Sequence, residues 1–198
     1  MDYRVYRAVD NFARHHTWLA HAANDFEKWG VAVYAAAVVL LWFAARPGRA
    51  GWPWKGGALA ATTSAFVGLL VNRAISSAWD RPRPYETHPN AYHLSRSHDP
   101  SFPSDHASAA FAIAFAILFF DVGVGAVFLT FAVLIAVGRV LIGAHYPGDV
   151  LAGLGVGMVV AAIVAVAARP LVLRIVSLLE RVTDPLVAPL HRRRAPEV

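Results

Sequence analysis

The chain has 198 residues, of which 57% are hydrophobic and only 16% charged, and its mean hydropathy is +0.47. This composition is too apolar for a soluble globular domain and indicates an integral membrane protein. The formal charge of +5 suits anionic lipid headgroups and gives no footprint for nucleic acid, while the absence of cysteine excludes disulfides, thiolate catalysis and cysteine-ligated metal.

The first 30 residues mix four acidic with four basic side chains and contain no continuous apolar core of the kind found in a signal peptide. Their apolar residues recur at roughly helical intervals, which predicts an amphipathic helix; they are Val5, Val9, Phe12, Leu19 and Phe26. Two positions for this helix stay open. It lies on the membrane surface, or it is a partly buried first helix packed on the bundle.

Five uncharged runs follow, each approaching the roughly 20 residues that a helix needs to cross a bilayer core of about 30 Å. They are residues 29–45, 56–72, 107–120, 122–138 and 150–168. With the N-terminal helix, they predict an all-α, polytopic membrane bundle of about six helices. Residues 1–170 form a single membrane domain in this interpretation, and residues 171–198 an amphipathic, basic, cytoplasmic C-terminal segment.

Basic residues gather in the connection between the first two runs and in the tail after the fifth: Arg46, Arg49, Lys55, Arg169, Arg174, Arg181 and Arg192 to Arg194. The positive-inside rule places both segments in the cytoplasm. The loops between runs two and three and between runs four and five then face outward. These two outer loops hold Arg81, Arg83, Ser104, His106, Arg139, His145 and Asp149, which makes them the candidate functional region.

The outer loops read "AWDRPRPYETHPN", "SRSHDPSFPSDHAS" and "GRVLIGAHYPGD". Arginine side chains match the oxygens of a phosphate, so converging arginines predict a phosphoryl ligand. Prolines on both sides of Arg83 favour an extended segment there. A helix start at Ser104 offers unpaired amides to an anion, with the Ser104 hydroxyl acting as helix cap, as phosphate donor, or as both.

Asp149 follows His145 by four residues across a Pro-Gly turn, so its carboxylate can accept one ring N–H and leave the other nitrogen free as a nucleophile. His106 is then available to protonate the leaving oxygen. This set predicts phosphoryl transfer to nitrogen. The motifs contain no metal-ligand spacing, and arginine repels cations, so we expect neither metal nor cofactor.

The three stretches resemble the signatures of the type 2 phosphatidic acid phosphatase superfamily. "GRVLIGAHYPGD" is similar to the third signature, with Gly138 in the usual serine position, "PSDH" to the second, with Asp105 for glycine, and "RPRP" to the end of the first. The resemblance implies His145 as nucleophile, Asp149 as its orienting partner and His106 as general acid. It implies Arg83, Ser104 and Arg139 as phosphate ligands.

Three further residues are candidate substrate ligands: Arg73, Arg81 and Asp105. The lysine of the first signature corresponds to Ser76, and Arg73, one turn earlier, is the candidate replacement. Arg81 either contacts phosphate or forms a surface pair with Asp80 or Glu86. Glu27, near the start of the first span, is a candidate for supporting the site.

These departures are similar to those of bacterial undecaprenyl-diphosphate phosphatases within the superfamily. This resemblance implies hydrolysis of undecaprenyl diphosphate to the monophosphate through a phosphohistidine, at the outer face of the bacterial cytoplasmic membrane. The alternative substrates are phosphatidic acid and phosphatidylglycerol phosphate. The alternative classes are a non-hydrolytic lipid transporter, which gives no reason for the histidine–aspartate pair, and a membrane scaffold, which leaves the polar cluster unexplained.

Overall fold

A computed structural model describes residues 2–192, with side chains at all of these positions except 187 and 190–192. The described part is all-helical, as predicted. Its elements are α1 Asp2–His15, α2 Thr17–Ala44, η1 Gly48–Gly51, α3 Trp52–Ala78, α4 Pro84–Thr87, α5 Asp105–Leu118, α6 Val122–Leu141, α7 Pro147–Ala162, the π-helical turn η2 Ile163–Ala167 and α8 Arg169–Arg192. The predicted count of six is too low, because the one-turn α4 and the C-terminal α8 are also helical.

Within residues 2–192, four helices are long and apolar enough to cross a membrane: α2, η1 with α3, α6, and α7 with η2. The chain is therefore a multi-pass membrane protein. The third predicted span, residues 107–120, corresponds to α5, which has only 14 residues. At 1.5 Å per residue it covers about 21 Å, less than the roughly 30 Å of hydrocarbon. Of the five predicted spans, four are therefore long enough in the described residues, and this one is a shorter apolar helix.

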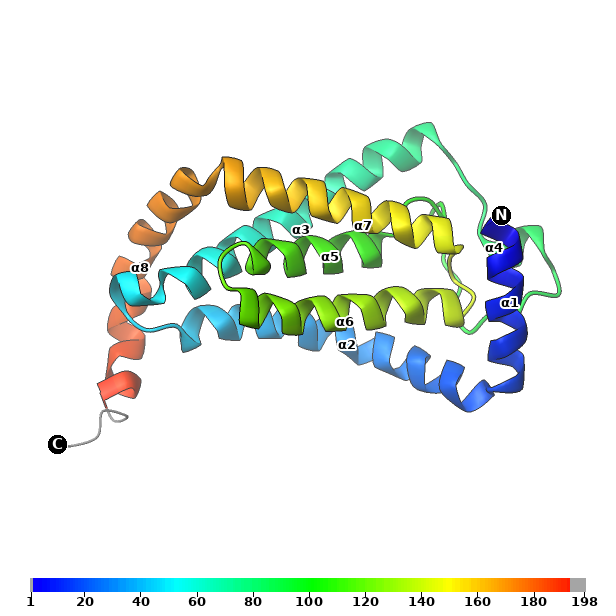
Figure 1. The fold of residues 1–198 in the computed structure, drawn as a ribbon, viewed down its shortest axis with the longest axis horizontal. Helices are drawn as coiled ribbons and strands as arrows, with labels where there is room; N and C mark the ends of the chain where they lie inside the picture. The colour runs from blue at the N-terminus through cyan, green and yellow to red at the C-terminus, as the bar shows by residue number, and fades with distance from the viewer. Residues whose placement is uncertain (1, 193–198) are drawn as a thin grey trace.

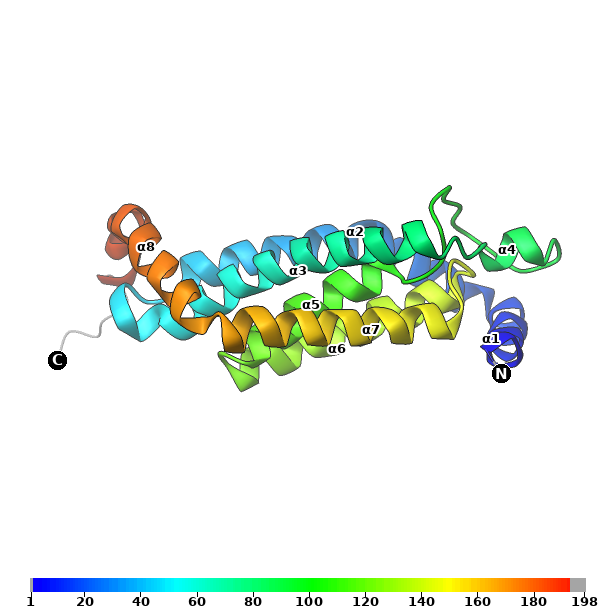
Figure 2. The ribbon, with the colours of Figure 1, turned by 90° about the horizontal axis from the view of Figure 1, so that it is seen from above.

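The short helix α5 lies inside the bundle, where it packs against α3, α6 and α7, while α2 packs on α3 and α6 (Figures 1 and 2). Nine of its 14 residues are buried. Gly157 of α7 allows the close approach, because a Cβ there would lie 2.7 Å from the backbone nitrogen of Ala112. This contact brings the N-terminal ends of α5 and α7 together at one end of the bundle.

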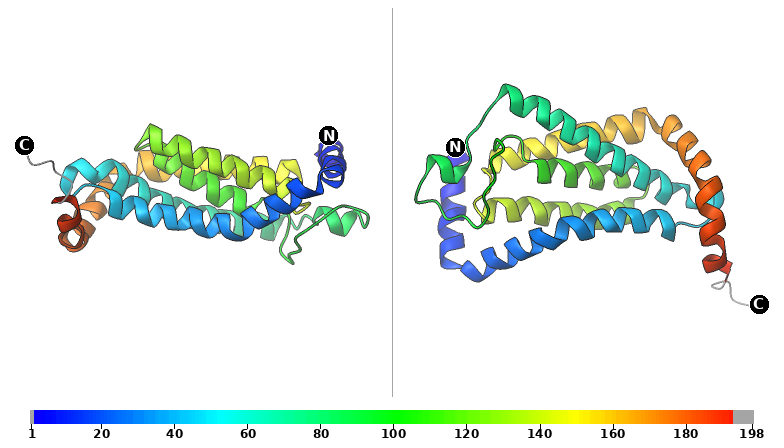
Figure 3. Two further views of the ribbon diagram at one scale, coloured as in Figure 1. Left: turned by 90° about the horizontal axis from the view of Figure 1, so that it is seen from below. Right: turned by 180° about the vertical axis from the view of Figure 1, so that it is seen from behind.

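Two helices cross the ends of the bundle. Figure 3 shows α1 at the end that carries the loop 79–104, and α8 at the opposite end beside the turn into α3. α8 is fixed there by buried Lys55, whose Nζ lies 2.5 Å from Asp184 and 3.3 Å from Glu180. The predicted basic segments thus lie opposite the polar loops. Arg193 and Arg194 lie outside the described residues.

α1 packs on the ends of α2, α6 and α7, which agrees with the second of its two predicted positions. Its buried residues are Tyr6 and Ala13, while Val5 and Phe12 of the predicted apolar stripe are exposed. Val5, Val9 and Phe12 instead face an apolar groove beside α6 and α7, and Leu19 and Phe26 of the predicted stripe lie on the separate helix α2.

Candidate active site

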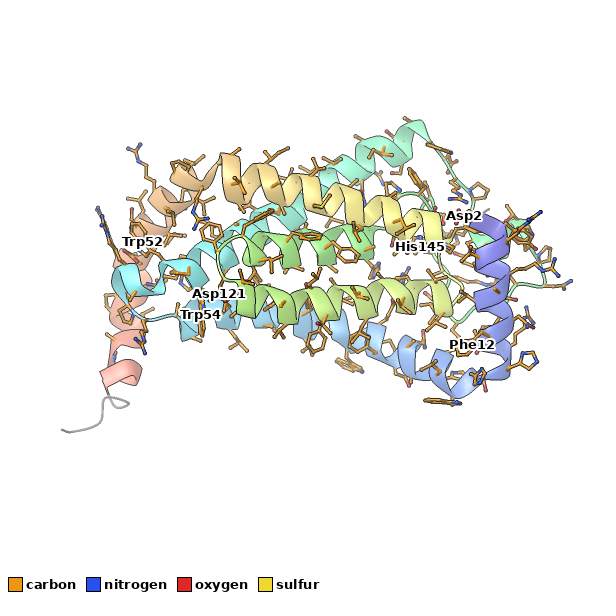
Figure 4. The ribbon with its side chains drawn as sticks, in the orientation of Figure 1. Asp2, Phe12, Trp52, Trp54, Asp121 and His145 are labelled. Atoms are coloured by element: carbon orange, nitrogen blue, oxygen red, sulfur yellow. The ribbon has the colours of Figure 1, made fainter. Side chains whose placement is uncertain are left out.

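The two predicted outer loops meet at one end of the bundle, and His145 lies at their centre, close to the N-terminal end of α1 (Figure 4). Gly143 makes this possible, since it ends α6 with φ +75° and a Cβ there would lie 2.0 Å from the Tyr92 carbonyl oxygen. α7 then begins at Pro147, as the Pro-Gly turn predicts. The chain reverses between two helices and leaves His145 facing the first loop.

The His145 ring is buried, with one nitrogen held and the other presented to cations. Its Nδ1 lies 2.8 Å from the carbonyl oxygen of Ser101. Because a carbonyl only accepts, Nδ1 carries the proton and donates it. Nε2 is unprotonated, and its lone pair accepts from an Nη atom of Arg83 at 3.3 Å and from one of Arg139 at 3.3 Å. An uncharged nucleophilic nitrogen between two guanidinium groups is suited to attack on a bound anion.

Asp149 lies behind the ring but does not accept its N–H directly. The carboxylate Oδ2 is 3.7 Å from Nδ1 and accepts instead from the Ser101 hydroxyl at 2.5 Å and from the Tyr146 amide at 2.9 Å. The expected direct bond is absent because the carboxylate also caps the first turn of α7. At 3.7 Å, the carboxylate can still form an ion pair with the His145 ring when that ring becomes positively charged.

Ser101 is the site residue that the sequence pattern did not single out. It is fully buried, and it contacts both His145 and Asp149. Its position three residues before the cap Ser104, inside a proline-containing stretch, was the only signal available.

Arg83 is held in the extended conformation (φ −74°, ψ 159°) that the following Pro84 favours. Its guanidinium donates to the Ala144 carbonyl at 2.9 Å and pairs with Asp99 at 2.8 Å. Partial burial raises the pKa of Asp99, but the Ser97 hydroxyl and the Arg83 charge outweigh this and lower it below its ordinary value. The arginine is thus fixed in place with a charged partner.

Arg139 reaches the ring from α6 and pairs with Glu27 of α2 at 2.7 Å, both side chains being buried. Glu27 therefore does contact the site. Within the described residues, Nε of Arg139 and Oε1 of Glu27 have no hydrogen-bond partner. A Cβ at Gly138 would lie 3.4 Å from that Oε1, so the glycine leaves room for the carboxylate.

The N-terminal turn of α5 supplies the second histidine. Ser104 caps this helix, accepting weakly from the Ala107 amide at 3.5 Å. Asp105 is exposed and accepts from the buried Asn72 amide at 2.8 Å. Burial, together with the charges of Arg139, His145 and Arg83, lowers the pKa of His106 to about 4. His106 is therefore within electrostatic reach of the other site residues.

The remaining two arginines lie differently. Arg81 pairs with neither Asp80 nor Glu86; it binds Asp149 at 2.6 Å and Asp2 at 2.7 Å. Arg73 is exposed, and in the described part of the chain it makes none of the hydrogen bonds or ion pairs of the site. Within residues 2–192, no three histidine or carboxylate side chains are grouped so as to hold a metal ion.

Comparisons of the sequence and of the fold with known proteins agree on one family. The chain is 28% identical to undecaprenyl-diphosphatase BcrC of Bacillus subtilis over 81% of this chain and 80% of that protein. It is 35% identical to putative undecaprenyl-diphosphatase YbjG of Escherichia coli and 40% identical to lipid A 1-phosphatase of Rhizobium etli. It spans only about half the length of each of these, 48% and 45% respectively.

Two solved structures share the fold. One is a transmembrane PAP2-type phosphatidylglycerolphosphate phosphatase from Bacillus subtilis, with a TM-score of 0.55 and 21% identity over 82% of each chain. The other is LpxE of Aquifex aeolicus, with a TM-score of 0.54 and 22% identity over 81% of this chain and 92% of that one. The PAP2 superfamily model matches residues 57–171, a region that contains both signature loops. The chain belongs to the PAP2 superfamily.

Proposed function

We propose that this membrane phosphatase hydrolyses undecaprenyl diphosphate to undecaprenyl phosphate and inorganic phosphate, without a metal ion. One observation carries the proposal: the free Nε2 of buried His145 faces guanidinium groups of both Arg83 and Arg139 at 3.3 Å. The undecaprenyl-diphosphatase names of relatives BcrC and YbjG support this choice of substrate.

In the first step, Nε2 of His145 attacks the terminal phosphorus. The N–P bond forms as the bond from phosphorus to the bridging oxygen breaks, and that oxygen takes a proton from His106. Undecaprenyl phosphate leaves. Arg83 and Arg139 stabilise the charge on the equatorial oxygens, and the Ser104 hydroxyl is a third ligand. Burial and the neighbouring cations lower the pKa of His106, and the negative charge of a bound diphosphate raises it, which supplies the protonated form that this step needs.

In the second step, water attacks the phosphohistidine. His106, now uncharged, takes a proton from the water as the N–P bond breaks. Inorganic phosphate leaves, and the uncharged His145 ring is restored. Throughout, the Ser101 carbonyl holds the Nδ1 proton, and Asp149 at 3.7 Å stabilises the positive charge that the ring carries as phosphohistidine. Arg73 and Asp105 remain proposed contacts at the rim of the substrate site.

The proposed location is the bacterial cytoplasmic membrane, with the site on the extracytoplasmic side. The opposite placement of basic segments and polar loops supports this orientation. A site at the membrane boundary also lets a long isoprenoid tail stay in lipid while its headgroup is hydrolysed. We assign catalysis to residues 1–170 and regard 171–198 as a basic cytoplasmic segment.

The test measures phosphate release by the purified protein in detergent with excess EDTA, comparing undecaprenyl diphosphate with phosphatidic acid and phosphatidylglycerol phosphate. We expect undecaprenyl diphosphate to be the best substrate. His145→Ala should abolish release while substrate binding survives, and His98→Ala, an exposed histidine in the first loop, should leave release unchanged. Release that survives His145→Ala, depends on magnesium, or favours a glycerophospholipid would contradict the proposal, and binding without release would indicate a transporter.

A further inference from the structure

The first residue of α1 reaches the active-site end of α7. Asp2 accepts a hydrogen bond from the Gly148 amide at 2.8 Å through Oδ1 and binds Arg81 at 2.7 Å through Oδ2. A Cβ at Gly148 would lie 2.9 Å from the Asp2 carboxylate, so glycine permits this approach. An acidic side chain from the N-terminal helix is therefore part of the charge cluster behind the proposed nucleophile.

Arg81 connects this carboxylate to the site. One terminal nitrogen binds Asp2, and the other binds Asp149 at 2.6 Å. The guanidinium also lies over the Tyr146 ring, 4.2 Å from its centroid. Because Asp149 uses its second oxygen for the Ser101 hydroxyl, a continuous series of contacts runs from α1 to the residues that hold the His145 ring.

Aromatic contacts and polar anchors together hold the start of α1: Tyr3 stacks on His88, and buried Tyr6 packs on Tyr146. Between α1, α6 and α7 lies a cavity of about 630 Å³, whose α1 side is lined by Val5, Val9 and Phe12 among others. At its other end, α1 is anchored by Asp10, which accepts from the Tyr92 amide at 2.6 Å. Asp2 is the corresponding anchor at the end near the site.

We propose that Asp2 is a positioning residue for the reaction: by binding Arg81, it holds Asp149 against Ser101 beside the His145 ring. This inference rests on the proposed function only in assigning that ring a catalytic task. The contacts themselves assign to α1 a part in the site that none of the signature motifs includes.

The charges around the ring make the proposal measurable. Those that face it or its immediate partners are Arg83 with Asp99 from the first loop, His106 of α5, Arg139 of α6 with Glu27 of α2, and Asp149 of α7. Asp2 and Arg81 add opposite charges behind Asp149. Removing the Arg81 cation should raise the pKa of His145, and removing the Asp2 anion should lower it, since Arg81 then acts on Asp149 alone.

The experiment uses the full chain, with any affinity tag at the C-terminus, and compares Asp2→Asn, Arg81→Gln, Asp2→Glu and the control Asp10→Asn. The pKa of His145 is read from NMR titration of ¹⁵N-labelled histidine rings without substrate, with the signal assigned by its loss in His145→Gln. We expect shifts of about 0.5 unit, downward for Asp2→Asn and upward for Arg81→Gln. Asp10→Asn should cause no shift, and the charge-conserving Asp2→Glu should stay near wild type.

Kinetics supply the second readout. We expect Asp2→Asn to lower kcat by about 3- to 10-fold with little change in KM, and the double variant to be no slower than Arg81→Gln, because Asp2 acts through Arg81. Shifts of the same sign for the two single variants, an equal shift for Asp10→Asn, or additive kinetic losses would overturn the inference. The titration needs no turnover. Opposite shifts in a protein that releases no phosphate would therefore contradict the proposed function alone.

Discussion

Glu27→Gln is the substitution for which the structure gives the clearest expectation. Glu27 and Arg139 are both buried and 2.7 Å apart, and each has one polar atom without a partner in the described part of the chain. Glutamine has the same shape and keeps an acceptor for the Arg139 guanidinium, but it removes the negative charge. The arginine then stays buried without a counterion until an anion binds.

Removing one member of a buried ion pair costs about 3–5 kcal/mol, and the retained hydrogen bond returns about 1 kcal/mol, so we expect a loss of about 2–4 kcal/mol in the free energy of unfolding. For a chain of this length, that loss lowers Tm by about 5–15 °C. A bound phosphate restores the missing charge. The Tm difference should therefore shrink in phosphate, and KM for the diphosphate should fall by about 3- to 10-fold because no carboxylate competes for Arg139.

The assay is thermal unfolding in detergent with and without inorganic phosphate, followed by steady-state kinetics. Asp25→Asn is the matched control, since it breaks an exposed pair with Lys28 on the same helix and should change Tm by less than about 2 °C. A Glu27→Gln protein as stable as wild type, or one that phosphate stabilises no more than it stabilises wild type, would refute the reasoning.

Three further predictions concern pH and glycine. Burial lowers the pKa of His145 below its ordinary value, and the charges of Arg139 and Arg83 add to this, so the ring gains its proton at a more acidic pH than a free imidazole does. The acid limb of kcat/KM should therefore have its midpoint below pH 6.5, and a midpoint above 7 would contradict this. The contribution of the ring to the free energy of unfolding should be lost as the pH falls from 6.5 through the pKa of the folded state. Gly138→Ser should retain phosphate release and change Tm little, because its hydroxyl has the unpaired oxygen of Glu27 within reach. Gly157→Val should lower the unfolding free energy by about 1–3 kcal/mol and reduce release, because its Cβ meets the Ala112 backbone; wild-type Tm and activity would show that α7 does not need this close contact.

Local patterns predicted the long helices and several of the residues that meet at the site, namely Arg83, Arg139, His145 and Asp149. The Pro-Gly turn located the start of α7, and the Ser104 cap located the start of α5. The run predicted at residues 107–120 has the same length as α5 but is displaced by two residues, because its apolar residues continue past Leu118 through the turn at Phe119 and Phe120. What was wrong was to count this helix as a full span. Composition alone does not distinguish a buried helix from one that crosses the bilayer.

The details of the histidine's environment depend on contacts between distant segments. Asp149 was expected on the ring itself, and only the fold shows that its oxygens are taken by Tyr146, Ser101 and Arg81. For Arg81, the sequence suggested either a phosphate contact or a pair with nearby Asp80 or Glu86. One of its partners in the structure, Asp2, is instead 79 positions away. No periodicity or motif spacing carries information of that range.

The most direct test of the central claim is to trap the covalent intermediate. The protein is mixed with undecaprenyl diphosphate labelled in the terminal phosphate, quenched in base within milliseconds, and digested for mass spectrometry. The account predicts acid-labile label on the peptide that contains His145, and none in His145→Ala. Rapid turnover with no labelled peptide, or label on any other residue, would contradict it.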